Sequence, residues 1–260
     1  RFLSGDEAFA EGVRLAKPQV ISAYPITPQT VVVERLSEMV EEGSLKAEYV
    51  HVESEHSALS CAMGASATGA RTFTATSSQG LLYMAEVLTY AAGGRFPIVM
   101  MNANRATALP WNIYGDQRDS LALLDHGWIQ AYAENNQEAL DLALMAYAVA
   151  EDPAVLTPFM VNLDGFALTH TYETVEVPSS EQADGRCARR GRRRCVLAAV
   201  SGDELLRLRA SEEHRVFRRS RLRPLLQVLR AQRHARCVRG DRSRGSALCG
   251  MLRSSVYGSC

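Results

Sequence analysis

Short apolar strands alternate with helical segments along the first two thirds of this 260-residue chain. Each expected strand is rich in β-branched or other apolar residues and is bounded by turn residues. The expected strands cover residues 20–24, 49–52, 72–76, 97–102, 128–132 and 155–162. This alternation predicts an α/β fold, in which an open parallel sheet carries helices on both faces and the crossovers are right-handed.

One strand end within this pattern carries a carboxylate. Residues 49–52 are expected to form a buried strand, Glu55 follows it, and small residues fill an expected helix at 57–69. Ligands of open parallel sheets bind outside the carboxyl ends of the strands, so Glu55 is a candidate for chemistry. A glutamate at a helix start is more often a capping or helix-dipole carboxylate, and that alternative stays open. Residues 77–80 are expected to be a polar turn before a helix at 81–92, with free N–H groups for a polar ligand.

Two other strand ends offer polar side chains. After the first strand we expect a helix at 29–42 that starts on Pro28, with Thr27 as its N-cap residue. Arg105 follows the apolar strand at 97–102, and its guanidinium suits a substrate carboxylate. Taken singly, the threonine is a simple cap and the arginine a structural ion pair. Together with Glu55 they predict a ligand site at one edge of the sheet.

The net charge of zero conceals a change of composition after residue 178. Up to that point seven Arg and two Lys face 22 acidic residues, whereas the remaining chain has 20 Arg, no Lys and seven acidic residues. We therefore expect a globular domain at 1–178 and an atypical Arg-rich tail at 179–260. Five of the six cysteines lie in the tail, and no C-x-x-C pair occurs, so neither a zinc ribbon nor an iron–sulfur ligand run is present in the sequence.

The tail admits two main interpretations. Arginine clusters neutralise phosphates, which would make this a non-catalytic protein with a basic nucleic-acid-binding arm. The absence of Lys and the scarcity of aromatic residues argue against nucleic acid as a partner. We favour an out-of-frame translation of a GC-rich gene, or a disordered segment, because Arg, Ala, Gly, Leu and Cys dominate the composition.

The remaining general features concern location. No signal-peptide pattern and no apolar run of 18 residues occurs in the sequence. We therefore expect a soluble cytoplasmic protein without membrane contact. The chain opens on Arg1 rather than on Met, so we expect its start to be incomplete.

Several motifs follow one another in a distinctive order. They are YPITP at 24–28, VESE at 52–55, GAS at 64–66, TSSQGL at 76–81, NRA at 104–106, GD at 115–116 and YAENN at 132–136. Residues 2–178 thereby resemble the alpha subunit of pyruvate:ferredoxin oxidoreductase and of related 2-oxoacid:ferredoxin oxidoreductases.

The resemblance implies that this is the domain that binds the aminopyrimidine of thiamine diphosphate. Glu55 would be the glutamate that bonds N1′ of the pyrimidine, and Thr27 and Arg105 would hold the 2-oxoacid. The implied activity is oxidative decarboxylation of pyruvate to acetyl-CoA and CO₂, with electrons passed to ferredoxin. Branched-chain 2-oxoacids and 2-oxoglutarate are the alternative substrates.

The resemblance also implies partner chains. The diphosphate motif of thiamine enzymes is Gly-Asp-Gly, but here Gly115 and Asp116 are followed by Gln117. We expect no metal on this chain; a beta subunit would complete the thiamine site, and Mg and the 4Fe-4S clusters would lie on partner subunits, among them the gamma and delta chains. The chain would be active only with these partners, and the complex would use coenzyme A and ferredoxin.

Overall fold

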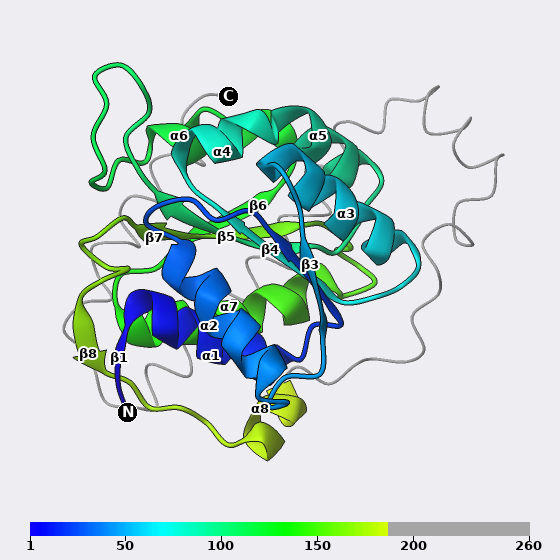
Figure 1. Ribbon diagram of the computed structural model, residues 1–260. Coiled ribbons are helices and arrows are strands. Elements are labelled where there is room, and N and C mark those ends of the chain that lie inside the picture. Colours follow the sequence, from blue (N-terminus) through cyan, green and yellow to red (C-terminus); the bar gives the residue numbers. More distant parts are fainter. Residues whose placement is uncertain (187–260) are drawn as a thin grey trace, which may run out of the picture. The chain divides into compact units, whose positions relative to one another are not determined.

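A six-stranded parallel sheet forms the centre of the computed structural model, which describes residues 1–186 (Figure 1). The strand order is β3-β2-β4-β5-β7-β6, and every neighbouring pair is parallel. The bounds are β2 Val20–Ala23, β3 Glu48–His51, β4 Thr72–Thr76, β5 Val99–Asn104, β6 Ile129–Tyr132 and β7 Phe159–Asp164. The predicted α/β class and the six predicted strands are confirmed.

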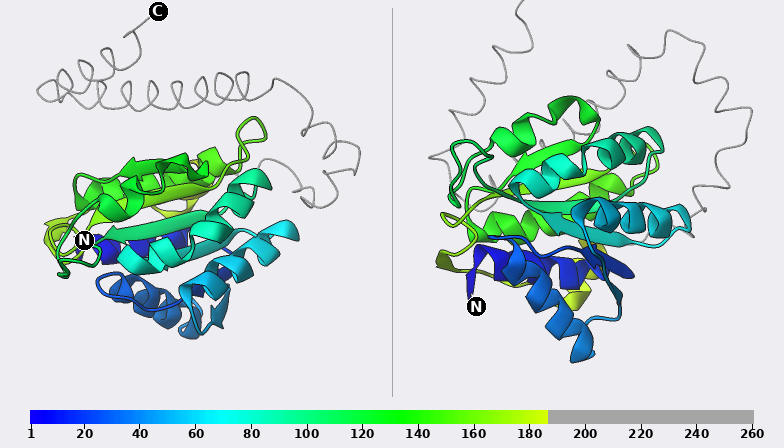
Figure 2. Two further views of the ribbon diagram at one scale, coloured as in Figure 1. Left: turned by 90° about the horizontal axis from the view of Figure 1, so that it is seen from above. Right: turned by 45° about the horizontal axis from the view of Figure 1, so that its top comes forward.

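Helices cover both faces of this sheet, as predicted (Figures 1 and 2). One face carries α1 (Gly5–Ala16), α2 (Thr30–Glu41) and α7 (Asn136–Ala150). The other carries α3 (Glu55–Ala67), α4 (Ser78–Tyr83), α5 (Ala85–Gly93), α6 (Arg118–Leu121) and the short 3-10 helix η1 (Leu124–His126). The central strands β4 and β5 are buried along their whole length, because helices pack on them from both sides.

The expectation of a buried strand at 49–52 was wrong. Within the described residues β3 is the edge strand of the sheet and pairs with β2 alone, and its residues are half-buried or exposed. The apolar and aromatic residues of β3 are typical of strands in general. They do not show whether a strand lies at the edge or in the centre of its sheet, so the edge position could not be read from the sequence.

The start of α2 also differs from the prediction. The helix begins at Thr30, its N-cap residue is Gln29, and Thr27 makes no cap. Gln29 N donates to Ile26 O at 2.9 Å, and Gln29 Nε2 donates to Tyr24 O at 2.8 Å, so a turn stands where the first helical residues were expected. Thr27 is thereby released from the helix.

The expected helix at 81–92 is two helices. α4 already begins at Ser78, and α5 follows α4 directly after Met84. The N–H of Ser78 was expected to be free for a ligand. It donates instead to the side chain of Asp119.

A two-stranded antiparallel sheet was not predicted. It pairs β1 (Phe2–Ser4) with β8 (Tyr172–Thr174). Strands of three residues are too short to show a period-2 pattern, so only the folded chain reveals them. The capping box of α1 begins at Ser4, the last residue of β1, so the small sheet leads directly into the helix.

The described structure continues past the predicted boundary at residue 178. Helix α8 (Ser180–Arg186) packs against α1, and Lys17 Nζ lies 2.7 Å from Asp184 Oδ1. The predictions for the rest of the tail, residues 187–260, lie outside the described residues. Among the helices of residues 1–186, none is long and apolar enough to cross a membrane.

Asp6 is a buried carboxylic acid in the first turn of α1. It is fully buried, and neither carboxyl oxygen has a hydrogen-bond partner within the described part of the chain. Burial, with a smaller contribution from the charge of Glu7, raises the pKa of Asp6 well above its ordinary value. The unfolded chain releases this proton at about pH 4 while the folded chain keeps it, so the free energy of unfolding falls as the pH rises above that value.

We therefore expect Asp6→Asn to stabilise the chain at neutral pH. The amide cannot ionise, so the melting temperature rises by about 3 °C or more at pH 8 and by less at pH 5. Thermal unfolding followed by circular dichroism at both pH values measures this. The exposed Asp125→Asn serves as the control and should show no such difference. An equal gain at both pH values for Asp6→Asn contradicts the account.

Candidate active site

The carboxyl edge of the sheet collects the predicted site residues. Thr27 follows β2, Glu55 follows β3 and Arg105 follows β5. The chain runs from β2 outward to β3 and then returns to β4 on the other side of β2, so the strand order reverses between β2 and β4. Such a switch point opens a crevice for ligands at the carboxyl ends of the strands.

Glu55 is the first residue of α3, yet it does not cap the helix. Ser54 is the N-cap residue and its side chain accepts from Ser57 N at 3.2 Å. The Glu55 side chain is half-buried, and its carboxylate takes part in none of the hydrogen bonds found among residues 1–186. Glu53, by contrast, is exposed and accepts from Ser57 Oγ at 2.9 Å. Glu55 is therefore not the cap of α3, but it lies in the first turn of that helix, so the helix-dipole alternative stays open. No hydrogen bond among residues 1–186 keeps its carboxylate from a ligand.

Gly80 lets this carboxylate reach the start of α4. A Cβ atom at position 80 would lie 2.7 Å from Glu55 Oε1 and 2.6 Å from Thr76 Oγ1. Both distances are shorter than any ordinary contact with a carbon atom. Only glycine therefore allows α3 and α4 to approach closely enough to place Glu55 against the end of β4.

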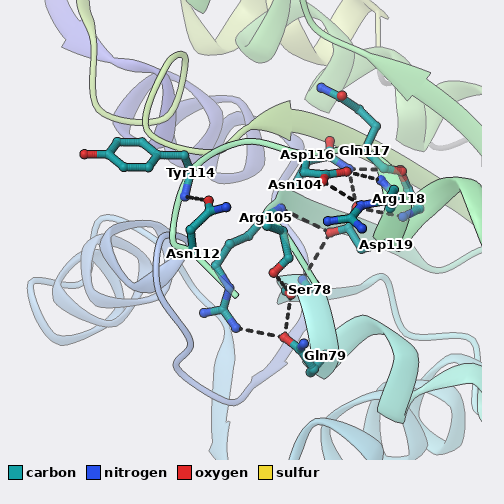
Figure 3. A network of polar contacts seen from close by, with 12 residues as sticks. Ser78, Gln79, Asn104, Arg105, Asn112, Tyr114, Asp116, Gln117, Arg118 and Asp119 are labelled. Atoms are coloured by element: carbon teal, nitrogen blue, oxygen red, sulfur yellow. Dashed lines mark hydrogen bonds and ion pairs between the residues drawn. The ribbon is translucent and has the colours of Figure 1, made fainter. Parts of the chain in front are cut away.

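Arg105 connects two loops of the same edge. Its Nη1 donates to Thr27 O at 2.7 Å, and its Nη2 donates to Gln79 Oε1 at 3.2 Å. The guanidinium carbon lies 5.9 Å from the centre of the Trp111 ring, an arrangement typical of a cation–π contact. Figure 3 shows the side chain of Arg105 extending toward Gln79. These contacts leave further N–H groups of the guanidinium for a carboxylate.

The structure thus brings Thr27 and Arg105 together, but through the backbone of Thr27. The threonine carbonyl accepts the hydrogen bond, and the residue itself is exposed at the sheet edge. Burial lowers the pKa of Arg105, while the charges of Asp119 and Glu55 oppose that change. The guanidinium stays charged, and Glu55 lies near enough to act on it.

A second carboxylate lies beneath the arginine. Asp119, in α6, is fully buried and accepts from Arg105 N at 3.3 Å and from Asn104 Nδ2 at 2.8 Å. Burial raises the pKa of Asp119, and hydrogen bonds from Asn104, Ser120, Arg105 and Asn102 oppose that rise.

Buried polar atoms without partners gather around this edge. Within the described residues, these orphaned atoms include Thr76 Oγ1, Ser77 Oγ, Asn104 Oδ1 and Arg105 Nε. Buried polar groups are normally hydrogen-bonded, so such a cluster indicates a site for a polar ligand. Together with the available Glu55 carboxylate and the close approach at Gly80, the cluster fits a cofactor ring that both donates and accepts hydrogen bonds.

Sequence reasoning missed four residues of this site: Gln79, Gly80, Trp111 and Asp119. Gln79 and Gly80 lie in the first turn of α4, a segment that was expected to be a polar turn acting only through its backbone. Trp111 and Asp119 belong to the segment between β5 and β6, whose irregular pattern gave no indication of which side chains face the sheet edge.

Residues 11–209 match the family described as pyruvate flavodoxin/ferredoxin oxidoreductase, thiamine diphosphate-binding. This match covers more than half of the chain. The chain belongs to this family. It therefore contains a thiamine diphosphate-binding domain, as the resemblance of its motifs had implied.

Curated relatives in this oxidoreductase family are similar over the same region. The chain is 57% identical over 184 residues to the pyruvate synthase subunit PorA of Methanothermobacter thermautotrophicus, covering 71% of this chain and 48% of that one. It is 59% identical over 182 residues to PorA of Pyrococcus horikoshii, covering 70% and 46%. The ketoisovalerate oxidoreductase subunit VorA of Pyrococcus furiosus is 53% identical over 184 residues, with 71% and 46% covered. The chain spans about half the length of the curated relatives it matches.

A solved structure shares the fold. The 2-oxoglutarate:ferredoxin oxidoreductase from Magnetococcus marinus, with 2-oxoglutarate, coenzyme A and succinyl-CoA bound, has a TM-score of 0.64 at 24% identity. The similarity covers 70% of this chain and 32% of that one. At this identity the comparison concerns the fold, and it agrees with the open parallel sheet described above.

Proposed function

We propose that this chain is the alpha subunit of a pyruvate:ferredoxin oxidoreductase and provides the pyrimidine side of its thiamine diphosphate site. The observation that carries the proposal is the convergence of Glu55 and Arg105 at the switch point of a thiamine diphosphate-binding domain. The high identity to pyruvate synthase subunits over residues of this domain supports the choice of pyruvate.

Glu55 would hold the proton on which the cofactor depends. Its carboxylate lies at the crowded contact with Gly80, and we assign to it the hydrogen bond with N1′ of the aminopyrimidine. When bound, thiamine diphosphate would supply a nucleophilic carbon for the keto group and a ring that accepts the electron pair released with CO₂. The small residues of α3 and the first turn of α4 would exclude water around this carboxylate.

Arg105 and Thr27 would hold the substrate. A 2-oxoacid has a carboxylate and a neighbouring keto oxygen, which match a guanidinium and a hydroxyl. Thr27 is exposed at the sheet edge, and its carbonyl oxygen and Gln79 hold the Arg105 guanidinium next to it, so we assign both residues to one substrate site.

The overall reaction requires components beyond this chain. Pyruvate and coenzyme A would give acetyl-CoA, CO₂ and a proton, and the released electron pair would reduce ferredoxin. We assign Mg and the diphosphate end of the cofactor to a beta subunit, and the 4Fe-4S clusters to partner chains. The missing Gly-Asp-Gly motif and the absence of any C-x-x-C pair from the sequence support this division.

Ketoisovalerate is the second candidate substrate, because VorA subunits are 52–53% identical to the chain. Identity to the PorA subunits is 56–59%. We therefore place pyruvate first. A nucleic-acid function rests on residues outside the described part of the chain.

The test is reconstitution with the beta, gamma and delta partners. We expect pyruvate-dependent reduction of a viologen dye that requires coenzyme A and thiamine diphosphate. The same assay with 2-oxoisovalerate and 2-oxoglutarate ranks the substrates by kcat/KM. A complex that assembles with thiamine diphosphate but reduces dye with none of these 2-oxoacids contradicts the proposed function.

Gly80→Ala tests the contact that positions Glu55. The new methyl group would displace the Glu55 carboxylate or the first turn of α4, so we expect kcat of the reconstituted enzyme to fall by about tenfold or more. Gly93→Ala is the matched control, because Gly93 ends α5, is exposed and has open space at the Cβ position. Equal activity of the two variants contradicts the proposed placement of Glu55.

A further inference from the structure

The buried carboxylate of Asp119 accepts hydrogen bonds from three separate segments. Asp119 lies in α6. One of its donors is the next residue of α6, and the others come from the end of β5 and the start of α4 (Figure 3). The donors are Ser120 N at 2.7 Å, Asn104 Nδ2 at 2.8 Å, Ser78 N at 3.1 Å, Arg105 N at 3.3 Å and Asn102 Nδ2 at 3.3 Å. Hydrogen bonds to an ionised acceptor are among the stronger ones in proteins, so Asp119 fixes these segments relative to one another.

The same contacts reach the backbone of Arg105 and the residue next to Gln79, whose side chain accepts from the Arg105 guanidinium. Asp119 Oδ2 receives Arg105 N and Ser78 N, and Ser78 stands next to Gln79. The backbone of Ser78 has a φ of 51°, which residues other than glycine rarely adopt. Its hydroxyl donates to Gln79 Oε1 at 2.6 Å. Gln79 Oε1 in turn accepts from Arg105 Nη2. Asp119 therefore holds the arginine backbone directly and the acceptor of its guanidinium through the first turn of α4.

We propose that Asp119 is a positioning residue that orients the Arg105 guanidinium for the carboxylate of the 2-oxoacid. This inference rests on the proposed function, because it takes Arg105 as the group that binds the substrate. Asp119 acts through Arg105 and does not itself contact the substrate.

Asp119→Asn tests the idea with almost no change of volume. Every neighbour is a donor, whereas an amide offers one acceptor oxygen and a second position that donates. Oδ1 accepts hydrogen bonds from Asn104 and Ser120, and Oδ2 accepts hydrogen bonds from Ser78, Arg105 and Asn102. Whichever of these positions the amide nitrogen of asparagine takes, its N–H groups would face other donors. The resulting shift should reach the guanidinium.

The experiment uses the reconstituted complex. For Asp119→Asn we expect KM for pyruvate to rise by about tenfold, while kcat and the thiamine diphosphate concentration for half-activation stay within about twofold. The dissociation constant of oxamate, a non-reacting mimic of pyruvate, should also rise by about tenfold when calorimetry is done without thiamine diphosphate. Asp116→Asn is the matched control, because this aspartate is three residues away and bonds to Arg118 on the surface.

A double mutant separates positioning from a general structural role. In an Arg105→Lys background, Asp119→Asn should change oxamate binding by less than about twofold, because the group it orients is gone. If Asp119→Asn does not fold, Asn104→Ala removes one donor and keeps the carboxylate, and a rise of about threefold in KM is then expected.

Three results overturn the inference while the wild-type complex is active: an unchanged KM for both variants, an additive effect in the Arg105→Lys background, or a parallel loss of thiamine diphosphate affinity. A wild-type complex that neither reduces dye with a 2-oxoacid nor binds oxamate overturns the proposed function and this inference with it.

Discussion

Glu55→Gln is expected to lower the turnover of the reconstituted enzyme by about 100-fold or more. The glutamine side chain has almost the same shape, but it cannot exchange a proton with a pyrimidine nitrogen. Because the Glu55 carboxylate has no hydrogen-bond partner among residues 1–186, its replacement should leave the fold intact. The measurement is kcat for dye reduction at saturating pyruvate, coenzyme A and thiamine diphosphate, together with the melting temperature.

Glu53→Gln is the control for this experiment. Glu53 precedes the same helix by two residues, is exposed and accepts from the Ser57 hydroxyl. Its replacement should change turnover by less than about twofold. Near-normal turnover in Glu55→Gln, or an equal loss in both variants, is incompatible with the proton role of Glu55.

Arg105→Lys is expected to raise KM for pyruvate by about 100-fold, with a smaller change in kcat. Lysine keeps the positive charge, but it cannot donate to Thr27 O and Gln79 Oε1 while presenting a flat fork to a carboxylate. It also loses the planar contact with Trp111. Steady-state kinetics with pyruvate as the varied substrate measures the effect.

Arg118→Lys is the corresponding control. This arginine lies in the same segment after β5, but it is exposed and its bonds go to Asp116. Its replacement should leave KM within about twofold. If lysine at position 105 supports a normal KM, the substrate carboxylate is bound by another group.

The sequence predicted the sheet well because its strands carry a strong local signal. Residues 98–101 are continuously apolar and lead into β5, which is buried between helices on both faces. The edge position of β3 and the pairing of β1 with β8 were not predictable, since both depend on contacts between residues far apart in the chain.

The candidate site could be proposed from the sequence only in outline. Glu55, Thr27 and Arg105 could be proposed because each directly follows a strand of a parallel sheet or its loop. Asp119 gave no such signal: a single aspartate in an irregular segment looks solvated, and only the fold places it under Arg105. The role of Gly80 was likewise hidden, because it depends on how closely α3 approaches α4.

The pairing of β1 with β8 has a consequence for biosynthesis. Phe2 faces Thr174, and Val175 N donates to Arg1 O at 2.7 Å, so the first residues described are held by residues made about 170 positions later. Domains fold during translation as their residues leave the ribosome. The segment before α1 must therefore wait, unpaired, until residue 175 has emerged, and a ribosome that stalls shortly before this point holds a domain whose small sheet cannot form.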